Sequence, residues 1–224
     1  MGEAREVRIE HHSLGMTPVE WFRTSDWDEA AAQDFEVRLA RSRPTSRPQY
    51  LLIKGLSLAR AGNSRSAEVL FERVIAEYPD SFVAPSAWEN LGDTRRTKGD
   101  LIAAADCYRE ALRLGPSRHV RGSAGLSLAE VLIEMGGEEV SEEALQVLRD
   151  ELPELTFNSS RFRWETALAI LSERLGEIET SKRAARRALD LIDAAPQFPR
   201  HGRDVGVATA TPEQRDALLR LSDQ

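Results

Sequence analysis

Apolar residues recur three and four positions apart through most of the chain, which is the periodicity of amphipathic helices. Four of these segments end at a glycine, and Gly62, Gly99, Gly136 and Gly176 are 37, 37 and 40 residues apart. A second amphipathic segment follows each glycine. Because glycine readily adopts the left-handed conformation that closes a helix, the pattern predicts a repeated unit of helix, tight turn and helix.

The clearest unit, residues 85–116, has small, apolar and aromatic residues at fixed spacing: Trp88, Leu91, Gly92, Gly99, Ala104, Tyr108, Ala111 and Pro116. The preceding unit, residues 49–80, has a matching set: Leu51, Gly55, Leu58, Gly62, Ala67, Phe71 and Pro79. Both units resemble the tetratricopeptide repeat (TPR). Arg95 stands where that family usually has tyrosine, and Lys54 and Val74 replace the usual leucine and alanine. The resemblance implies an all-α fold, a right-handed superhelical array of TPR-like helix-turn-helix hairpins with terminal capping helices.

Two later units, residues 122–153 and 162–195, fit the repeat less closely. In the third unit the turn at 137–141 is about three residues too long for the repeat, so we expect the second helix to begin near Glu142. In the fourth unit Ala185 stands where a phenylalanine is expected.

The N-terminal end is expected to cap the array, because an end repeat otherwise exposes its apolar face. Residues 1–16 are expected to be a flexible leader, and residues 17–48 an N-terminal capping hairpin. A capping box at 17–20 opens this hairpin, and a longer helix runs from Asp26 to about Arg41.

The C-terminal end is expected to carry a second cap. Residues 196–211 contain two prolines and two glycines and are expected to be an extended linker. Thr211 then opens a capping helix over 212–224. The linker carries Phe198 and Arg200, so it is also a candidate to lie in a groove of its own array.

Composition narrows the class of protein. With 224 residues, a net charge of −7, 41% hydrophobic and 30% charged residues, the chain is neither a disordered tail nor a membrane protein. The polar N-terminus has no secretory signal core, and Cys107 is the single cysteine, so we expect a cytoplasmic protein. The excess of 27 arginines over three lysines indicates a GC-rich genome and favours a bacterial source.

No catalytic or cofactor-binding motif is present. Four histidines lack a cysteine or histidine partner at zinc-site spacing: His11, His12, His119 and His201. Cys107 falls on the inward side of an expected helix, which favours a buried thiol over a nucleophile. Acidic pairs at 138–139 and 142–143 flank a helix start, where negative charge is favourable without catalysis. We therefore expect no enzyme, no cofactor and no metal, with a catalyst on a helical-repeat scaffold as a third alternative.

The TPR resemblance implies that the first helix of each hairpin lines a concave groove for a peptide or partner helix. By position, the groove contains Gln49, Leu52, Leu56, Ser86, Glu89, Asn90, Asp93, Arg96, Ser127, Glu130 and Arg163. Asn90 stands where many TPR proteins hydrogen-bond a ligand backbone. The family's carboxylate clamp also needs a lysine and an asparagine where this chain has Leu52 and Leu56, so an acidic chaperone C-terminus is not the expected ligand. An amphipathic or basic segment fits better, unless the leucines pack inside the superhelix and the charges are merely solvated.

A basic cluster on the second helix of the fourth unit offers an alternative surface: Lys182, Arg183, Arg186 and Arg187. Its functional interpretation is an anionic partner, and its structural interpretation is a solvated helix face. The acidic total charge and the lack of interleaved aromatic residues argue against nucleic acid. We therefore expect a non-catalytic protein–protein interaction module or adaptor, with a regulatory or nucleic-acid-associated module as the alternative. No membrane or small-molecule partner is implied, and homodimerisation stays open.

Overall fold

The computed structural model describes residues 20–118, 123–151, 155–198, 200 and 205–224; for residues 116–118 it describes the backbone. Regular structure in these residues is helical: α1 (Glu29–Arg41), a short 3-10 turn (Pro44–Ser46), α2 (Arg47–Arg60), α3 (Ser64–Glu77), α4 (Ala84–Thr97), α5 (Leu101–Arg118), α6 (Ala124–Met135), α7 (Glu138–Glu151), α8 (Asn158–Arg174), α9 (Ile178–Ile192) and α10 (Pro212–Asp223). This confirms the predicted all-α class. None of the described helices is long and apolar enough to cross a membrane.

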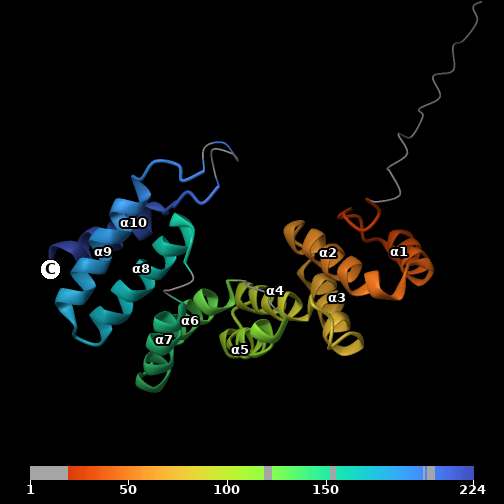
Figure 1. Ribbon diagram of the computed structural model, residues 1–224, viewed down its shortest axis with the longest axis horizontal. Helices are drawn as coiled ribbons and strands as arrows, with labels where there is room; N and C mark the ends of the chain where they lie inside the picture. The colour runs from red at the N-terminus through yellow and green to blue at the C-terminus, as the bar shows by residue number, and fades with distance from the viewer. Residues whose placement is uncertain (1–19, 119–122, 152–154, 199, 201–204) are drawn as a thin grey trace, which may run out of the picture.

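The helices pair along the chain into hairpins, α2 with α3, α4 with α5, α6 with α7, and α8 with α9. Each hairpin packs on the next through α3 on α4, α5 on α6 and α7 on α8, and α10 packs on α9. The hairpins follow a curved path with α2, α4, α6 and α8 on its inner side (Figure 1). The predicted helical repeat array is therefore confirmed, and its inner side is made of the first helices.

The turn between α6 and α7 is shorter than expected. Gly136 and Gly137 both have positive φ angles, 69° and 105°. Two left-handed residues in succession reverse the chain within the turn, so α7 already begins at Glu138. The expectation of a long turn with a helix start near Glu142 is wrong, and Glu138 and Glu139 lie inside the first turn of α7.

Glycine inside the hairpins lets an aromatic ring lie against the facing helix. A Cβ atom at Gly92 would be 2.7 Å from Cε1 of Tyr108, and one at Gly55 would be 2.5 Å from Cε1 of Phe71. Both rings are fully buried. The small residues of the repeat pattern are thus a packing requirement of each hairpin.

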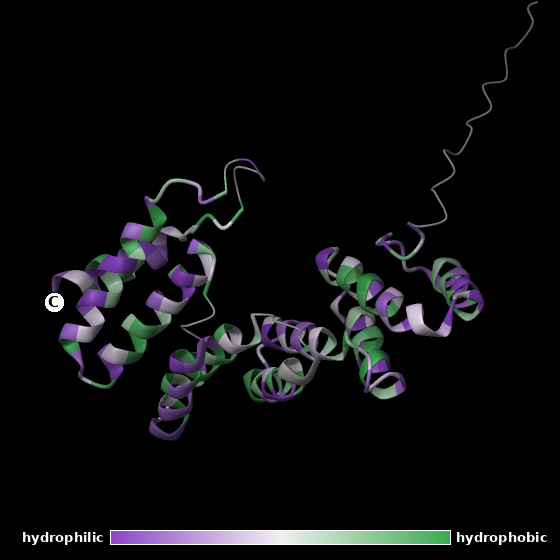
Figure 2. Ribbon diagram, in the orientation of Figure 1, coloured by the Kyte–Doolittle hydropathy of each residue, from purple (hydrophilic) through white to green (hydrophobic). Residues whose placement is uncertain are grey.

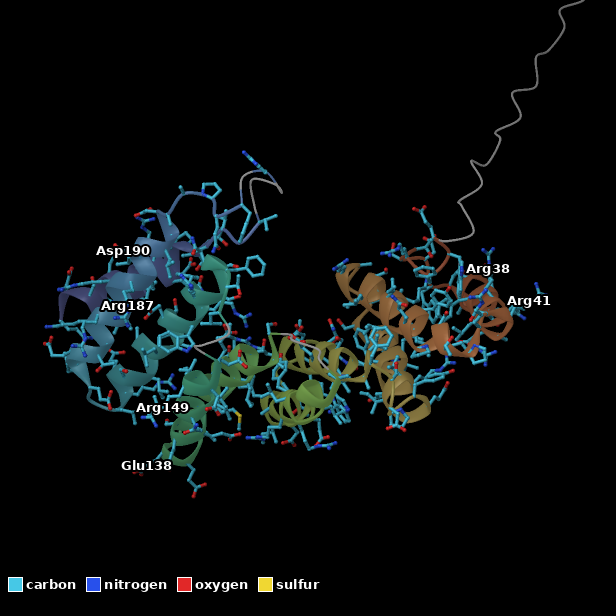
Figure 3. The ribbon with its side chains drawn as sticks, viewed as in Figure 1. Arg38, Arg41, Glu138, Arg149, Arg187 and Asp190 are labelled. Atoms are coloured by element: carbon cyan, nitrogen blue, oxygen red, sulfur yellow. The ribbon has the colours of Figure 1, made fainter. Side chains whose placement is uncertain are left out.

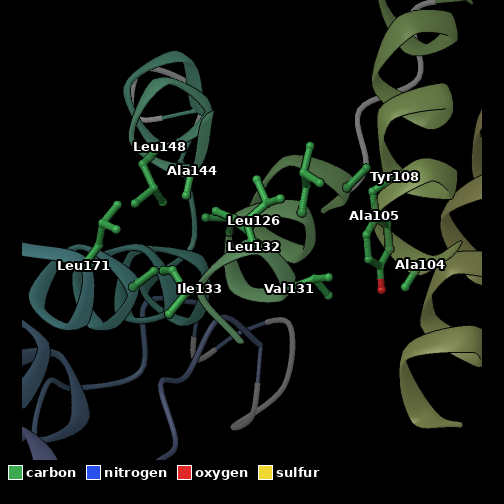
Figure 4. Close-up of a cluster of buried hydrophobic side chains, with 14 of the residues drawn as sticks. Ala104, Ala105, Tyr108, Leu126, Val131, Leu132, Ile133, Ala144, Leu148 and Leu171 are labelled. Atoms are coloured by element: carbon green, nitrogen blue, oxygen red, sulfur yellow. The ribbon is translucent and has the colours of Figure 1, made fainter. Parts of the chain in front are cut away.

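The core runs along the array between the helices, which carry both hydrophobic and hydrophilic residues (Figure 2). Its middle section lies between the second, third and fourth hairpins. Tyr108, Leu132, Leu148 and Leu171 are at most 1% exposed there (Figure 4). Burial of such side chains stabilises the fold by roughly 1.5–3 kcal/mol each.

Lys54 is buried and connects the N-terminal segment to α2. Its side chain is 1% exposed, and Nζ donates hydrogen bonds to the Thr24 carbonyl oxygen at 2.7 Å, Thr24 Oγ1 at 2.9 Å and the Asp26 carbonyl oxygen at 2.9 Å. The ammonium group also lies 5.1 Å from the Trp27 ring centroid. This explains why lysine replaces the leucine of the repeat pattern: it fixes the segment that covers the first hairpin.

The first helix starts later than expected. Asp28 is its N-cap and accepts a hydrogen bond from the Ala31 amide at 2.8 Å, so α1 begins at Glu29 rather than at Asp26. The leader and three residues of the expected capping box, 17–19, lie outside the described residues.

The linker after α9 covers the start of α8. Gln197 Oε1 accepts a hydrogen bond from the Asn158 amide at 3.1 Å, and the Gly206 carbonyl oxygen accepts one from the Ser159 amide at 2.9 Å. These contacts satisfy two amides that the first turn of a helix leaves without intrahelical partners. Thr211 then opens α10 as expected, and it forms a capping box with Gln214.

Candidate partner-binding site

The predicted groove residues all lie on the first helices of the hairpins. They lie on α2 (Gln49, Leu52, Leu56), α4 (Ser86, Glu89, Asn90, Asp93, Arg96), α6 (Ser127, Glu130) and α8 (Arg163). Leu52 and Ser127 are 7% and 3% exposed, so their side chains are buried in the array and offer a partner little surface to contact. Leu56 is half-buried, whereas Gln49 and Asp93 are exposed.

An ion-pair network joins three successive hairpins across the inner face of the array. Glu130 of α6 lies between two guanidinium groups, that of Arg96 from α4 and that of Arg163 from α8. Arg96 Nη1 is 2.7 Å from Glu130 Oε2, and Arg163 Nε is 2.7 Å from Oε1. Arg163 Nη2 also donates to Glu130 Oε2 and to Ser127 Oγ, both at 3.0 Å. Arg96 additionally pairs with Glu134.

The electrostatics of the network keep Glu130 ionised. Burial by itself raises the pKa of Glu130, but the hydrogen bonds and charges of Arg163 and Arg96 outweigh it and hold the pKa below its usual range. Burial also lowers the pKa of Arg163, and its contacts with Glu130 more than compensate. Both oxygens of Glu130 accept hydrogen bonds from guanidinium groups, so this carboxylate links α4, α6 and α8.

Three other predicted residues make contacts within the array. Glu89 Oε1 accepts hydrogen bonds from the amide and hydroxyl of Ser123, both at 2.7 Å, and so links α4 to the start of α6. Asp93 Oδ1 accepts a hydrogen bond from the Tyr108 hydroxyl at 2.8 Å. Asn90 Nδ2 donates only to the Ser86 carbonyl oxygen of its own helix, at 2.7 Å. Of these three side chains, Asn90 therefore makes its hydrogen bond within its own helix, whereas Glu89 and Asp93 contact other parts of the array.

The basic cluster on α9 is largely paired within the chain. Arg187 makes a bidentate ion pair with Glu165, at 2.7 and 2.9 Å. Arg186 donates to the Ser222 carbonyl oxygen, and Lys182 lies 3.7 Å from a carboxylate one turn before it. Arg183 has no partner among the residues that the structure describes. Figure 3 labels Arg187 and Asp190 on α9, and Glu138 and Arg149 on α7. Carboxylates therefore neutralise Lys182 and Arg187, whereas Arg186 contacts a neutral carbonyl group.

Catalytic chemistry finds little support in the described part of the chain. Cys107 is a free thiol with no exposed surface, and burial raises its pKa to about 11. Glu143 forms a bidentate ion pair with Arg109, both distances being 2.8 Å. The described residues contain no group of three metal-ligating side chains, and all four histidines lie outside them.

The linker does not lie among the groove residues where it is described. Phe198 packs edge-to-face on Phe157, directly before α8, with 5.7 Å between the ring centroids. Arg200 is exposed. The described part of the linker therefore packs on the N-terminal end of α8, and residues 199 and 201–204 lie outside the described residues.

Sequence reasoning missed several residues of the inner face. Glu134 lies one helical turn after Glu130 on the same face of α6, a spacing that could have identified it. Arg174 of α8 donates a hydrogen bond to the Ile133 carbonyl oxygen of α6. Nothing in the local sequence around Arg174 indicates this contact, because the two residues belong to different hairpins.

Two comparisons with known proteins agree with this architecture. Residues 85–118 match the family model of the tetratricopeptide repeat. The structure is similar to the crystal structure of a thermophilic TPR protein of Thermus thermophilus, with a TM-score of 0.50 and 20% sequence identity over 79% of this chain and 100% of that chain. At this identity the similarity concerns the fold. No curated protein matched the sequence.

Proposed function

Because the chain is a tetratricopeptide repeat protein, we propose that it is a non-catalytic interaction module, an adaptor that binds a peptide or a helix of another protein on its inner face. TPR arrays generally act as protein-interaction modules. Fold alone does not determine function, so the proposal depends on the surface itself.

The observation that carries the proposal is the network through Glu130, which joins α4, α6 and α8. It holds the inner faces of three hairpins in one arrangement before any partner arrives. A surface that is ordered in advance loses less conformational entropy when it binds. Asn90 and the exposed Asp93 lie on this ordered surface and can be reached by a partner.

The charges favour a basic or amphipathic partner. Glu89, Asp93 and Glu134 each use one carboxylate oxygen inside the chain, and the second oxygen has no partner among the described side chains. The guanidinium groups of Arg96 and Arg163 are both engaged with Glu130. The half-buried Leu56 on α2 adds an apolar side to this acidic centre.

A steric and electrostatic block of the inner face tests the proposal. Asn90→Arg places a long cation on α4 and disturbs only a hydrogen bond within its own helix. Gln146→Arg makes a comparable change at an exposed position of the outer helix α7. Affinity capture from a native extract should recover a protein with wild type and with Gln146→Arg, and lose it with Asn90→Arg. Circular dichroism checks that all three proteins are equally helical, and equal capture by both variants would refute the assignment.

A further inference from the structure

The last part of the chain has a core of its own. Side chains of α8, α9, α10 and the preceding linker form one buried cluster: Phe162, Ala169, Ala184, Ala185, Ala188, Ala208, Leu218 and Leu221. Polar contacts reinforce it, since Arg186 of α9 donates to the Ser222 carbonyl oxygen of α10 at 3.1 Å. The segment from α8 to α10 is therefore internally packed and can move as one body, which we call the C-terminal unit.

The C-terminal unit contacts the third hairpin through α8. Trp164, Ala167 and Leu171 of α8 are buried in the middle core, and we call these three residues the Trp164 stripe; the half-buried Leu168 and Ile170 of α8 also pack against this core. Trp164 Nε1 also donates a hydrogen bond to the Leu148 carbonyl oxygen of α7, at 2.6 Å.

On the inner side, two arginines of α8 reach across to α6. Arg163 pairs with Glu130, and Arg174 donates to the Ile133 carbonyl oxygen. The Arg163 and Glu130 side chains are 33% and 23% exposed. Salt and cationic groups in solution can therefore reach this ion pair, whereas the Trp164 stripe is shielded from both.

We propose that the Arg163–Glu130 ion pair is a latch that sets the opening of the inner face. While it is closed, the C-terminal unit is held against α6. When a competing cation or high salt releases it, the unit rotates about the Trp164 stripe, the inner faces of α6 and α8 separate, and the outer helices α7 and α9 approach each other. This deepens the proposed function by adding a control to the same face, and the basic groups of a partner are the natural competitor for Glu130.

Spin labels on the outer helices measure the movement directly. Gln146→Cys on α7 and Arg183→Cys on α9 introduce exposed labelling sites, whereas the buried Cys107 does not label in the folded protein. Pulsed electron–electron double resonance then gives the distance between the two labels. Releasing the latch with Arg163→Gln should shorten this distance and raise the open fraction about tenfold. Raising salt from about 50 to about 500 mM should also shorten the distance between the labels in the protein that keeps Arg163.

Arg109→Gln is the matched control, because Arg109 and Glu143 form a bidentate ion pair of similar geometry between α5 and α7. It should leave the α7–α9 distance unchanged. The latch is refuted if the distance between the labels is the same in Arg163→Gln as in the labelled protein that keeps Arg163. It is also refuted if Arg109→Gln changes this distance as much as Arg163→Gln does. Arg163→Lys should restore part of the closed state. Because no partner is present in this experiment, a failed capture experiment would refute the proposed function without deciding the latch.

Discussion

Glu130→Gln tests the central link of the inner face. The substitution keeps the shape of the side chain and removes the charge that Arg96 and Arg163 share. Glu130 accepts three hydrogen bonds from the two guanidinium groups, at 2.7, 2.7 and 3.0 Å. A glutamine has one acceptor oxygen, and its amide group would face a donor that it cannot pair with.

The size of the effect follows from these contacts. A hydrogen bond to a charged group contributes about 1.5–3 kcal/mol, and breaking a fully buried ion pair costs about 3–5 kcal/mol. The Glu130 side chain is 23% exposed, so solvent screens part of the interaction. We expect the free energy of unfolding to fall by roughly 2 kcal/mol.

Urea unfolding followed by circular dichroism measures this loss. Glu142→Gln, at an exposed position of α7, is the matched control and should change stability by less than about 0.5 kcal/mol. A double-mutant cycle with Arg163→Gln should show a coupling of about 1 kcal/mol or more. A Glu130→Gln protein as stable as the Glu142→Gln protein would refute the reasoning.

The pH dependence of stability gives the same prediction a second readout. The folded state holds the pKa of Glu130 below its unfolded value, which is about 4.3. The unfolded state therefore binds the proton more readily, so the contribution is fully present above the unfolded pKa and is lost as pH falls through the folded pKa. Wild type should lose stability over this acidic range by more than Glu130→Gln does. Parallel curves for the two proteins would contradict the prediction.

Three further predictions concern packing, the N-terminal segment and the thiol. Gly92→Ala should lower stability by about 1–3 kcal/mol, measured by thermal unfolding, because its Cβ would lie 2.7 Å from the buried Tyr108 ring; an unchanged melting temperature would contradict this. Lys54→Leu should release residues 20–28 to limited proteolysis while the repeats stay folded, since it removes the hydrogen bonds to Thr24, and wild-type cleavage rates would count against that role. Cys107 should react with a thiol reagent only as the protein unfolds, because its pKa is about 11 and no surface is exposed; rapid reaction of the native protein would disprove its burial.

Much of the fold could be predicted because each repeat is local. Helix periodicity and the glycine turns depend on residues within one hairpin, and so do the Gly55–Phe71 and Gly92–Tyr108 contacts. The length of the turn between α6 and α7 was predicted wrongly, because the repeat pattern provides for one glycine there. Gly136 and Gly137 together make a tighter reversal. The repeat pattern alone could not predict the backbone conformation of Gly137, on which the length of this turn depends.

The candidate site was only partly predictable because its contacts cross hairpins. Residues could be placed on the inner face from helix periodicity alone. Their partners depend on how far each hairpin is rotated on the next, which no local pattern determines. Arg163, for example, is 33 residues from the carboxylate that it contacts. Lys54 is a similar case: its departure from the repeat pattern was visible, whereas its hydrogen bond to Thr24, 30 residues earlier, was not.

The inner face must both hold the array together and bind a partner, and the same carboxylates serve both purposes. A basic partner that contacts only the second oxygens of Asp93 and Glu134 leaves the Arg163–Glu130 pair intact and binds the closed form. One that reaches Glu130 must displace Arg163 and so binds better to the open form. Since a ligand shifts a conformational equilibrium only by its difference in affinity for the two states, Arg163→Gln should strengthen binding of the second kind of partner and weaken binding of the first. Comparing partner affinity between wild type and Arg163→Gln therefore reveals which carboxylates the partner uses.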